Sequence, residues 1–222
     1  MDKKYFKLGW GCTKVSAGCE NCYMYRNSEL YNKNPEEIRY FSIPNARKRM
    51  AEYGDLIFVN SNTDTFHEKT DFDKIDKWFN LFMEFPEKTF QILTKRTNRM
   101  RKYFETRDCP DNCWLGTSIE DQAHVFRADT LRRIDCKTRF ISFEPVLGPI
   151  NYCNLEGIHW ILIGGESDNK NPRPMKPEWA RGIIELGRRA GTAIFFKQWG
   201  GVGGSGAGGH IIDGHVIQEF PE

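Results

Sequence analysis

The sequence has no long apolar run, and this absence excludes a membrane-spanning helix. Such a helix needs about 18 or more consecutive apolar residues, and no stretch of the 222 residues comes near that length. The N-terminal segment MDKKYFKLGWGC also lacks the apolar core of a secretory signal. We therefore expect a cytoplasmic protein that makes no contact with a membrane.

The chain likewise lacks a dominant charge and the composition of a disordered protein. It carries 32 Lys and Arg against 30 Asp and Glu, a net charge of +2, so it is not a polycation. Aromatic residues make up 14% of the chain and include 16 Phe, which favours a packed core. The length fits a single domain over residues 1–222.

The seven cysteines cannot all pair with one another, because their number is odd. Without an export signal, this argues against a disulfide framework and favours metal or redox chemistry. Three of them form the motif C-x6-C-x2-C at Cys12, Cys19 and Cys22, and we expect residues 1–24 to form a cysteine-motif loop region. The other cysteines are Cys109, Cys113, Cys136 and Cys153.

Two patterns alternate along the chain. Apolar runs rich in β-branched and aromatic residues predict strands at Leu56–Val59, Thr89–Leu93, Cys113–Gly116, Arg139–Phe143, His159–Ile163 and Thr192–Phe196, and a weaker one at Lys4–Leu8. Segments of helical period predict helices at Pro44–Tyr53, Phe72–Glu84, Thr97–Glu105, Ala123–Ile134 and Glu178–Ala190. This alternation indicates parallel strands joined by crossover helices. The continuous apolar runs indicate strands that are buried on both faces.

Polar residues or glycines follow six of the predicted strands, and a parallel barrel gathers such strand ends on one face. We therefore predict an α/β fold: a TIM-like (β/α) barrel, complete or partial, with the cysteine loop on that face. An open doubly wound sheet is the alternative, because it also binds ligands at the carboxyl ends of its strands. Residues 200–222 are expected to form a glycine-rich tail and a loosely attached hairpin turning at Asp213-Gly214.

A basic segment lies between Lys88 and Arg107. It holds seven Lys or Arg residues and a single acid, Glu105. Such a segment can attract phosphate or nucleic acid. The alternative is a solvated basic helix face without a ligand.

The cysteine motif admits more than one metal. Three thiolates can hold a [4Fe–4S] cluster and leave one iron open for a ligand. A structural zinc site needs four ligands, and Cys153, His67 or His124 could supply the fourth. In a third interpretation the cysteines are reduced and buried, with no metal.

A cysteine triplet after the first strand of a (β/α) barrel resembles the radical S-adenosylmethionine (SAM) superfamily. Over most of residues 9–222 the chain more closely resembles a family of uncharacterised three-cysteine-motif proteins of phages and prokaryotes. The matching stretches are GCTKVSAGCENCY, FVNSNTDTFHE, ILTKRTNRM, WLGTSIEDQ, RFISFEPVLGPI, WILIGGES, RPMKPEWAR, FFKQWGG and IIDGHVIQEFP. The resemblance implies a protein of bacterial or phage-infected host cells.

The resemblance further implies a barrel of radical SAM type and an iron–sulfur enzyme. Cys12, Cys19 and Cys22 would hold the [4Fe–4S] cluster, and its open iron would bind S-adenosyl-L-methionine. An electron from a reductase or flavodoxin-like donor would cleave SAM, and the resulting radical would abstract hydrogen from a substrate. The residues expected to bind SAM are Asn60, Asn62, Asp64, Ser118, Glu120, Gly164 and Gly165.

Other strand-end residues are left for the substrate. The expected catalytic residues are Glu144, Lys197 and Glu166. The expected substrate-binding residues are Lys95, Arg96 and Gln198. A Lys-Arg pair suits phosphate or carboxylate, so a nucleic-acid base or nucleotide is the expected substrate, for modification or repair. The alternative function is a zinc-containing phage protein that binds nucleic acid without catalysis.

Overall fold

The computed structural model describes residues 3–168, 170–203 and 206–221. Its centre is a seven-stranded sheet in which all neighbouring strands are parallel. In sheet order the strands are β1 (Lys3–Phe6), β4 (Tyr53–Val59), β5 (Thr89–Thr94), β6 (Cys113–Ser118), β7 (Thr138–Phe143), β8 (Trp160–Gly164) and β10 (Ala193–Gln198). All seven predicted strands are confirmed, with ends that differ by up to three residues.

The described residues contain six α-helices: α1 (Tyr23–Leu30), α2 (Ile43–Met50), α3 (Phe72–Met83), α4 (Thr97–Phe104), α5 (Phe126–Arg132) and α6 (Pro177–Ala190). Five of them were predicted, although the segment 123–134 is divided into a 3-10 turn and α5. The helix α1 was not predicted, because its sequence YMYRNSEL buries only Met24 and Ser28 and so shows little helical periodicity. None of the described helices is both long and apolar enough to cross a membrane.

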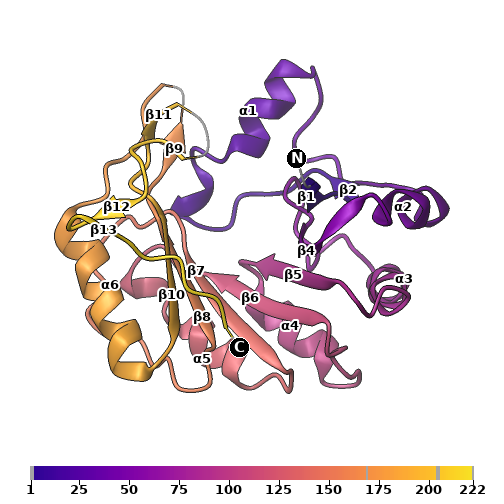
Figure 1. The fold of residues 1–222 in the computed structure, drawn as a ribbon. Helices are drawn as coiled ribbons and strands as arrows, with labels where there is room; N and C mark the ends of the chain where they lie inside the picture. The colour runs from indigo at the N-terminus through magenta and orange to yellow at the C-terminus, as the bar shows by residue number, and fades with distance from the viewer. Residues whose placement is uncertain (1–2, 169, 204–205, 222) are drawn as a thin grey trace.

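The strands follow one another in the sheet in the same order as in the chain. The predicted alternative, a doubly wound sheet, is therefore wrong, because that fold reverses its strand order at a switch point. The sheet instead curls into a half-barrel, with α3 to α6 around its outside (Figure 1). In the described part of the chain β1 and β10 do not pair with each other, so the barrel is partial.

The two faces of the sheet bury different side chains. Ile57, Ile92 and Ile161 are fully buried in the main core, which includes apolar residues of the helices. The opposite, concave face carries larger rings such as Trp114 and Trp160, which meet edge to face with centroids 5.9 Å apart. The concave face is therefore lined by aromatic side chains.

Two short ribbons lie beyond the carboxyl ends of the strands. β2 (Gly9–Trp10) follows β1 and pairs antiparallel with β3 (Arg39–Tyr40). β9 (Ser167–Asp168) follows β8 and pairs in parallel with β11 (Gly201–Val202). Together with α1 they surround this edge of the half-barrel (Figure 1).

The C-terminal segment covers the free edge of β10. The predicted hairpin is confirmed: β12 (Ile211–Ile212) and β13 (His215–Val216) are antiparallel and turn at Asp213-Gly214, both with positive φ. Beyond it the Phe196 N–H donates to the Ile217 carbonyl at 2.8 Å. The predicted loose attachment is therefore wrong, because main-chain hydrogen bonds fix the segment to the sheet. Residues 204 and 205 of the glycine-rich tail lie outside the described residues.

Candidate cofactor site at the carboxyl edge of the sheet

Residues 11–22 form a loop, the cysteine loop, at the carboxyl edge of the half-barrel. It begins at Gly11, where φ is +93° and a Cβ would lie 2.3 Å from the Glu37 carbonyl oxygen, so glycine is required. It contains the 3-10 turn Ala17–Cys19 and ends where α1 begins at Tyr23. The loop thus lies on the face of the strand ends, as predicted.

Arg96, two residues beyond β5, holds the start of the cysteine loop. Its Nη1 lies 3.6 Å from Sγ of Cys12, and its Nη2 donates to Oγ1 of Thr13 at 2.8 Å. The same guanidinium pairs with Asp64, at 3.0 Å from Nη1, and with Glu68, at 2.7 Å from Nε. This buried cation therefore joins the loop to residues that follow β4 and β5.

His67 supports the same part of the loop. Burial, followed by the charge of Arg96, lowers the pKa of His67, so its ring is neutral at neutral pH. Its Nδ1 accepts a hydrogen bond from the Lys69 N–H at 3.1 Å, which leaves the proton on Nε2. Nε2 then donates to Oγ1 of Thr13 at 3.0 Å. Both ring nitrogens are occupied, so His67 positions the loop and is not free to bind a metal.

Glu120, which is fully buried just beyond β6, holds the middle of the loop. Its carboxylate accepts a hydrogen bond from Ser16 and lies 2.7 Å from Nη1 of Arg127 and 3.6 Å from Nζ of Lys95. A Cβ on Gly18 would lie 2.4 Å from Cγ of Glu120. Glycine at this position therefore permits the close approach of the loop to the carboxylate.

Glu166, beyond β8, holds the end of the loop. Its carboxylate accepts hydrogen bonds from Nδ2 of Asn21 at 2.8 Å and from Nε of Arg173 at 2.9 Å. Arg173 in turn donates to the Ala17 carbonyl and to the Glu20 carboxylate, both at 2.9 Å. Burial acts to raise the pKa of Glu166, but the hydrogen bonds from Arg173 and Asn21 outweigh it, and the pKa is lowered.

The helix after the loop is anchored in the same way. The hydroxyl of Tyr23 donates to the carbonyl of Ser61, which follows β4. Arg26 of α1 forms an ion pair with Asp168 of β9 at 3.2 Å. Residues beyond β4, β5, β6 and β8 thus bind the cysteine loop or α1, and this accounts for many of the polar strand ends seen in the sequence.

The three thiols of the loop are partly buried and free of disulfides. Burial, with a contribution from the charge of Asp64, raises the pKa of Cys12 to about 12, although Arg96 opposes the shift. Burial also raises the pKa of Cys22, and Cys19 contributes electrostatically to both shifts. Cys12 and Cys22 are therefore protonated thiols at neutral pH, which must release protons if they bind a metal.

The loop fits a metal cluster in donor type and in local charge. It offers three thiols from one short segment, and the Arg96 guanidinium beside Cys12 would stabilise a thiolate. Within the described ranges, however, no three His, Cys, Asp or Glu side chains are arranged to hold one metal ion.

Three of the residues predicted to bind SAM are buried and bound to the protein itself. Oδ1 of Asn60 accepts the Leu8 N–H at 2.8 Å, and Asp64 and Glu120 form the ion pairs described above. Asn62 and Ser118 are also buried at the same edge. The contacts of Asn60, Asp64 and Glu120 are sufficient to explain their burial, and a role in SAM binding stays a prediction for all five.

Gly164 and Gly165, the two glycines predicted to bind SAM, are closely approached by other parts of the chain. A Cβ on Gly165 would lie 1.8 Å from the Trp199 carbonyl oxygen, and one on Gly164 would lie 2.5 Å from Oε1 of Glu144. The close approach predicted here for a cofactor is therefore made by the segment after β10 and by a carboxylate.

The predicted catalytic residues do not form one cluster of contacts. Nζ of Lys197 lies 2.8 Å from Oε1 of Glu144, and this pair is partly exposed. Oε2 of Glu144 also accepts a hydrogen bond from Ser142 at 2.9 Å. Attraction to Glu144 raises the pKa of Lys197, so the lysine is charged. Glu166, in contrast, is bound to Asn21 and Arg173 at the cysteine loop.

The predicted substrate-binding residues differ in how far their side chains are exposed to a substrate. The side chain of Lys95 is 17% exposed and lies near Glu120. Arg96 is buried in the network that holds Cys12. Gln198 is buried too; its Nε2 donates to Oγ of Ser167 at 3.0 Å and its Oε1 accepts the Gly206 N–H at 2.7 Å. Of the three, Lys95 retains the most access to a substrate.

The basic segment 88–107 does not present a continuous free basic face. Lys88 is buried and donates to the Tyr53 carbonyl at 2.7 Å. Arg101 pairs with Glu105 at 2.9 Å, and Arg107 pairs with Asp76 at 2.6 Å. Carboxylates thus neutralise Arg101 and Arg107, and Lys88 is withdrawn from solvent, so these three residues do not form a free phosphate-binding site.

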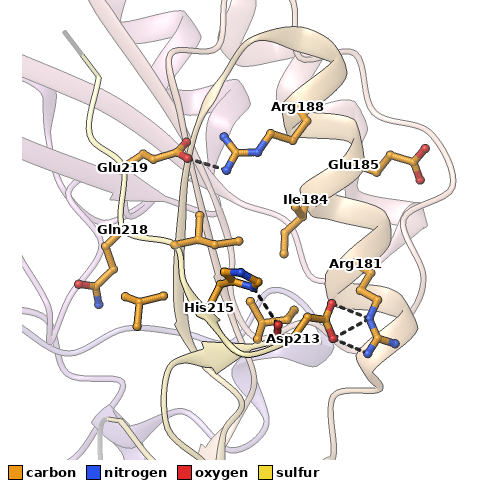
Figure 2. A pocket seen from close by; sticks show the side chains of 11 residues that line it. Arg181, Ile184, Glu185, Arg188, Asp213, His215, Gln218 and Glu219 are labelled. Atoms are coloured by element: carbon orange, nitrogen blue, oxygen red, sulfur yellow. Dashed lines mark hydrogen bonds and ion pairs between the residues drawn. The ribbon is translucent and has the colours of Figure 1, made fainter.

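A hollow of about 540 Å³ lies between α6 and the C-terminal hairpin. Two ion pairs span it, Arg181 with Asp213 at 2.7 Å and Arg188 with Glu219 at 2.6 Å, and Figure 2 shows both. The hollow contains none of the predicted site residues. Each of these arginines is paired with a carboxylate of the C-terminal segment, so the ion pairs attach that segment to α6.

Several residues that build the site escaped the sequence analysis. Thr13, Ser16, Gly18 and Asn21 lie between or beside the cysteines, so their place inside the motif was the available signal. Arg173 lies far along the chain, where a lone arginine carries no signal. Pairings such as Arg173 with Glu166 are set by the fold and cannot be read from spacing.

The sequence profile of one protein family, described as a protein of unknown function (DUF5131), matches residues 3–221. Comparison with curated proteins finds no match, and comparison with solved structures finds none either. The family match spans the half-barrel, the cysteine loop and the C-terminal segment. The chain therefore belongs to the DUF5131 family.

Proposed function

We propose that this protein is a radical-SAM-type enzyme in which Cys12, Cys19 and Cys22 hold a [4Fe–4S] cluster. The observation that carries the proposal is the cysteine loop: three thiols outside any disulfide, held at the carboxyl edge of a parallel half-barrel. Parallel α/β folds place their ligands at this edge. The cluster with SAM would supply reductive cleavage of SAM and hydrogen abstraction from a substrate, using an electron from a reductase or flavodoxin-like donor.

In this proposal some strand-end residues hold the cysteine loop in place, and others contact SAM. Arg96 would stabilise the Cys12 thiolate by its N–H group, 3.6 Å from the sulfur. Glu120 and Glu166 would fix the loop through Ser16 and Asn21. Asn62 and Ser118 are then left to contact SAM, because Gly164 and Gly165 already face Glu144 and the Trp199 carbonyl.

The concave face is the proposed place for the substrate. Its aromatic side chains exclude water, which protects a reactive intermediate. Nε2 of Gln91, a buried residue level with Phe58 and Trp114 on this face, has no hydrogen-bond partner within the described chain. An unpaired buried amide is costly, so a substrate group that accepts its hydrogen bond would relieve that cost. Glu144 and Lys197 supply the charged groups of this face.

The zinc alternative has less support from the contacts. His67 uses both ring nitrogens within the protein, and burial raises the pKa of the Cys153 thiol to about 12. His124 pairs with Asp121 at 2.7 Å.

The test is anaerobic purification followed by iron, sulfide and zinc analysis. About four irons and four sulfides per chain are expected, and Cys12→Ala, Cys19→Ala and Cys22→Ala should each lose them. Cys136→Ala is the matched control, a partly buried free cysteine just before β7. Reduced protein should then convert SAM to methionine and 5′-deoxyadenosine. Equimolar zinc, or no metal in anaerobic protein, would contradict the proposal.

A further inference from the structure

A second hollow, of about 530 Å³, lies between β3 and α2, on the outside of the molecule. Its walls combine three cations with an exposed ring: Lys7, Lys48, Arg49 and Phe41. Phe41 is 40% exposed, while its N–H donates to the Leu8 carbonyl at 2.9 Å. The ring is therefore presented to solvent from a fixed backbone.

The three cations of this hollow have no carboxylate partner in the described chain. Burial, followed by the like charges of Arg49 and Lys33, lowers the pKa of Lys7. Nη2 of Arg49 contacts the Tyr53 hydroxyl at 3.3 Å, which leaves its charge unopposed. The basic segment 88–107 differs, because Arg101 and Arg107 there pair with the carboxylates of Glu105 and Asp76. Crowded like charges favour an anion that neutralises them together.

We infer that this hollow binds single-stranded nucleic acid. Its cations would contact backbone phosphates, and Phe41 would stack against an unpaired base. Proteins that bind single strands combine these two features, a positive groove and aromatic rings on which bases stack. A duplex hides its base faces, so Phe41 favours the single strand. The inference concerns a surface separate from the cysteine loop and does not depend on a cluster.

The test is fluorescence anisotropy with a labelled 12-nucleotide oligothymidylate and the same strand in a duplex, at 50 and 200 mM salt. The full chain should bind the single strand more tightly, and more tightly at low salt. K48Q/R49Q should weaken binding roughly tenfold and reduce the salt slope by about 1.4, since each phosphate contact contributes about 0.7 on single strands. F41L should weaken binding about fivefold or more with the salt slope unchanged.

The matched control is K102Q/K137Q, which removes the same charge from exposed lysines elsewhere. It should keep the affinity of the unmodified protein. The inference is overturned if the control loses as much affinity as K48Q/R49Q, if F41L has no effect, or if the single strand does not bind at 50 mM salt. Equal binding of polyglutamate or of phosphatidylserine vesicles would overturn it too, in favour of a protein or a membrane partner.

The chain with Cys12, Cys19 and Cys22 all replaced by Ala separates this inference from the proposed function. It should bind the oligonucleotide as the unmodified chain does, whatever metal that chain contains. If the cysteine triple variant loses binding while its thermal unfolding is unchanged, the hollow is not the binding surface, and the inference fails.

Discussion

The Arg96 guanidinium stands between the sulfur of Cys12, 3.6 Å away, and the carboxylate of Asp64, 3.0 Å away. A single buried cation therefore joins the motif near the N-terminus to the loop that follows β4. The planar guanidinium has several N–H donors, so it can pair with the Asp64 carboxylate and contact the Cys12 sulfur at the same time. The cysteine loop and the sheet edge are linked through this contact.

Arg96→Met is expected to lower the free energy of unfolding by about 3–5 kcal/mol, because Asp64 would keep a buried charge without its partner. Urea unfolding of the metal-free protein measures it. Arg101→Met removes an exposed ion pair with Glu105 and should cost under about 0.5 kcal/mol. A loss for Arg96→Met no larger than this control would show that the network contributes little.

Gly18→Ala is expected to destabilise the protein by about 1–3 kcal/mol, because its Cβ would overlap Glu120. The displaced loop should also retain less iron after anaerobic reconstitution. Gly182→Ala is the matched control in α6, where a Cβ meets no atom within 4 Å. It should stabilise the protein by about 0.5–1 kcal/mol through helix propensity. Equal effects of the two substitutions would contradict the packing argument.

Glu166 is expected to make the free energy of unfolding depend on pH. Its pKa is lowered in the folded protein, so its stabilisation is full above its unfolded pKa of about 4.3 and is lost as the pH falls through the folded value. Glu166→Gln should therefore cost about 1–3 kcal/mol at pH 7, and the difference from the unmodified protein should shrink below about pH 4. Unfolding curves from pH 7 to pH 3 measure this.

The control for Glu166 is Glu185→Gln, which removes an exposed ion pair with Arg189 inside α6. It should change stability by under about 0.5 kcal/mol at pH 7. If the cost of Glu166→Gln stayed constant down to pH 3, the ionised carboxylate would not be the group that holds Asn21 and Arg173.

Phe220→Ala is expected to cost about 1–2 kcal/mol, because the ring stacks on Trp160 at 5.3 Å between centroids but is half exposed. The neighbouring carbonyl of Glu219 accepts the Trp160 Nε1–H at 2.8 Å, so the C-terminal segment should also loosen from β10. Hydrogen exchange of the Phe196 amide should then accelerate. Leu30→Ala, at a side chain that is 74% exposed, should leave both readouts unchanged.

The patterning of apolar residues was enough to predict the seven strands and five of the helices. Runs such as RFISF and HWILI are buried on both faces, and their composition does not depend on partners far along the chain. The helix α6 is an equally local case. Pro177 begins it, and Gly191, at φ +66°, ends it in the left-handed conformation that glycine favours.

The sequence also determined that three cysteines share one short loop after the first strand, since spacing is a property of the chain itself. Only the tertiary structure decided what the polar strand ends do. Glu120 meets Ser16 across 104 positions and Glu166 meets Asn21 across 145, and such pairings follow from the curl of the sheet. The tertiary structure likewise decided which basic residues lack a carboxylate partner. Charge counts indicated residues 88–107 as the basic surface, whereas Arg101 and Arg107 pair with carboxylates in the fold. Among the residues that the structure describes, Lys7, Lys48 and Arg49 have no such partner and line one hollow.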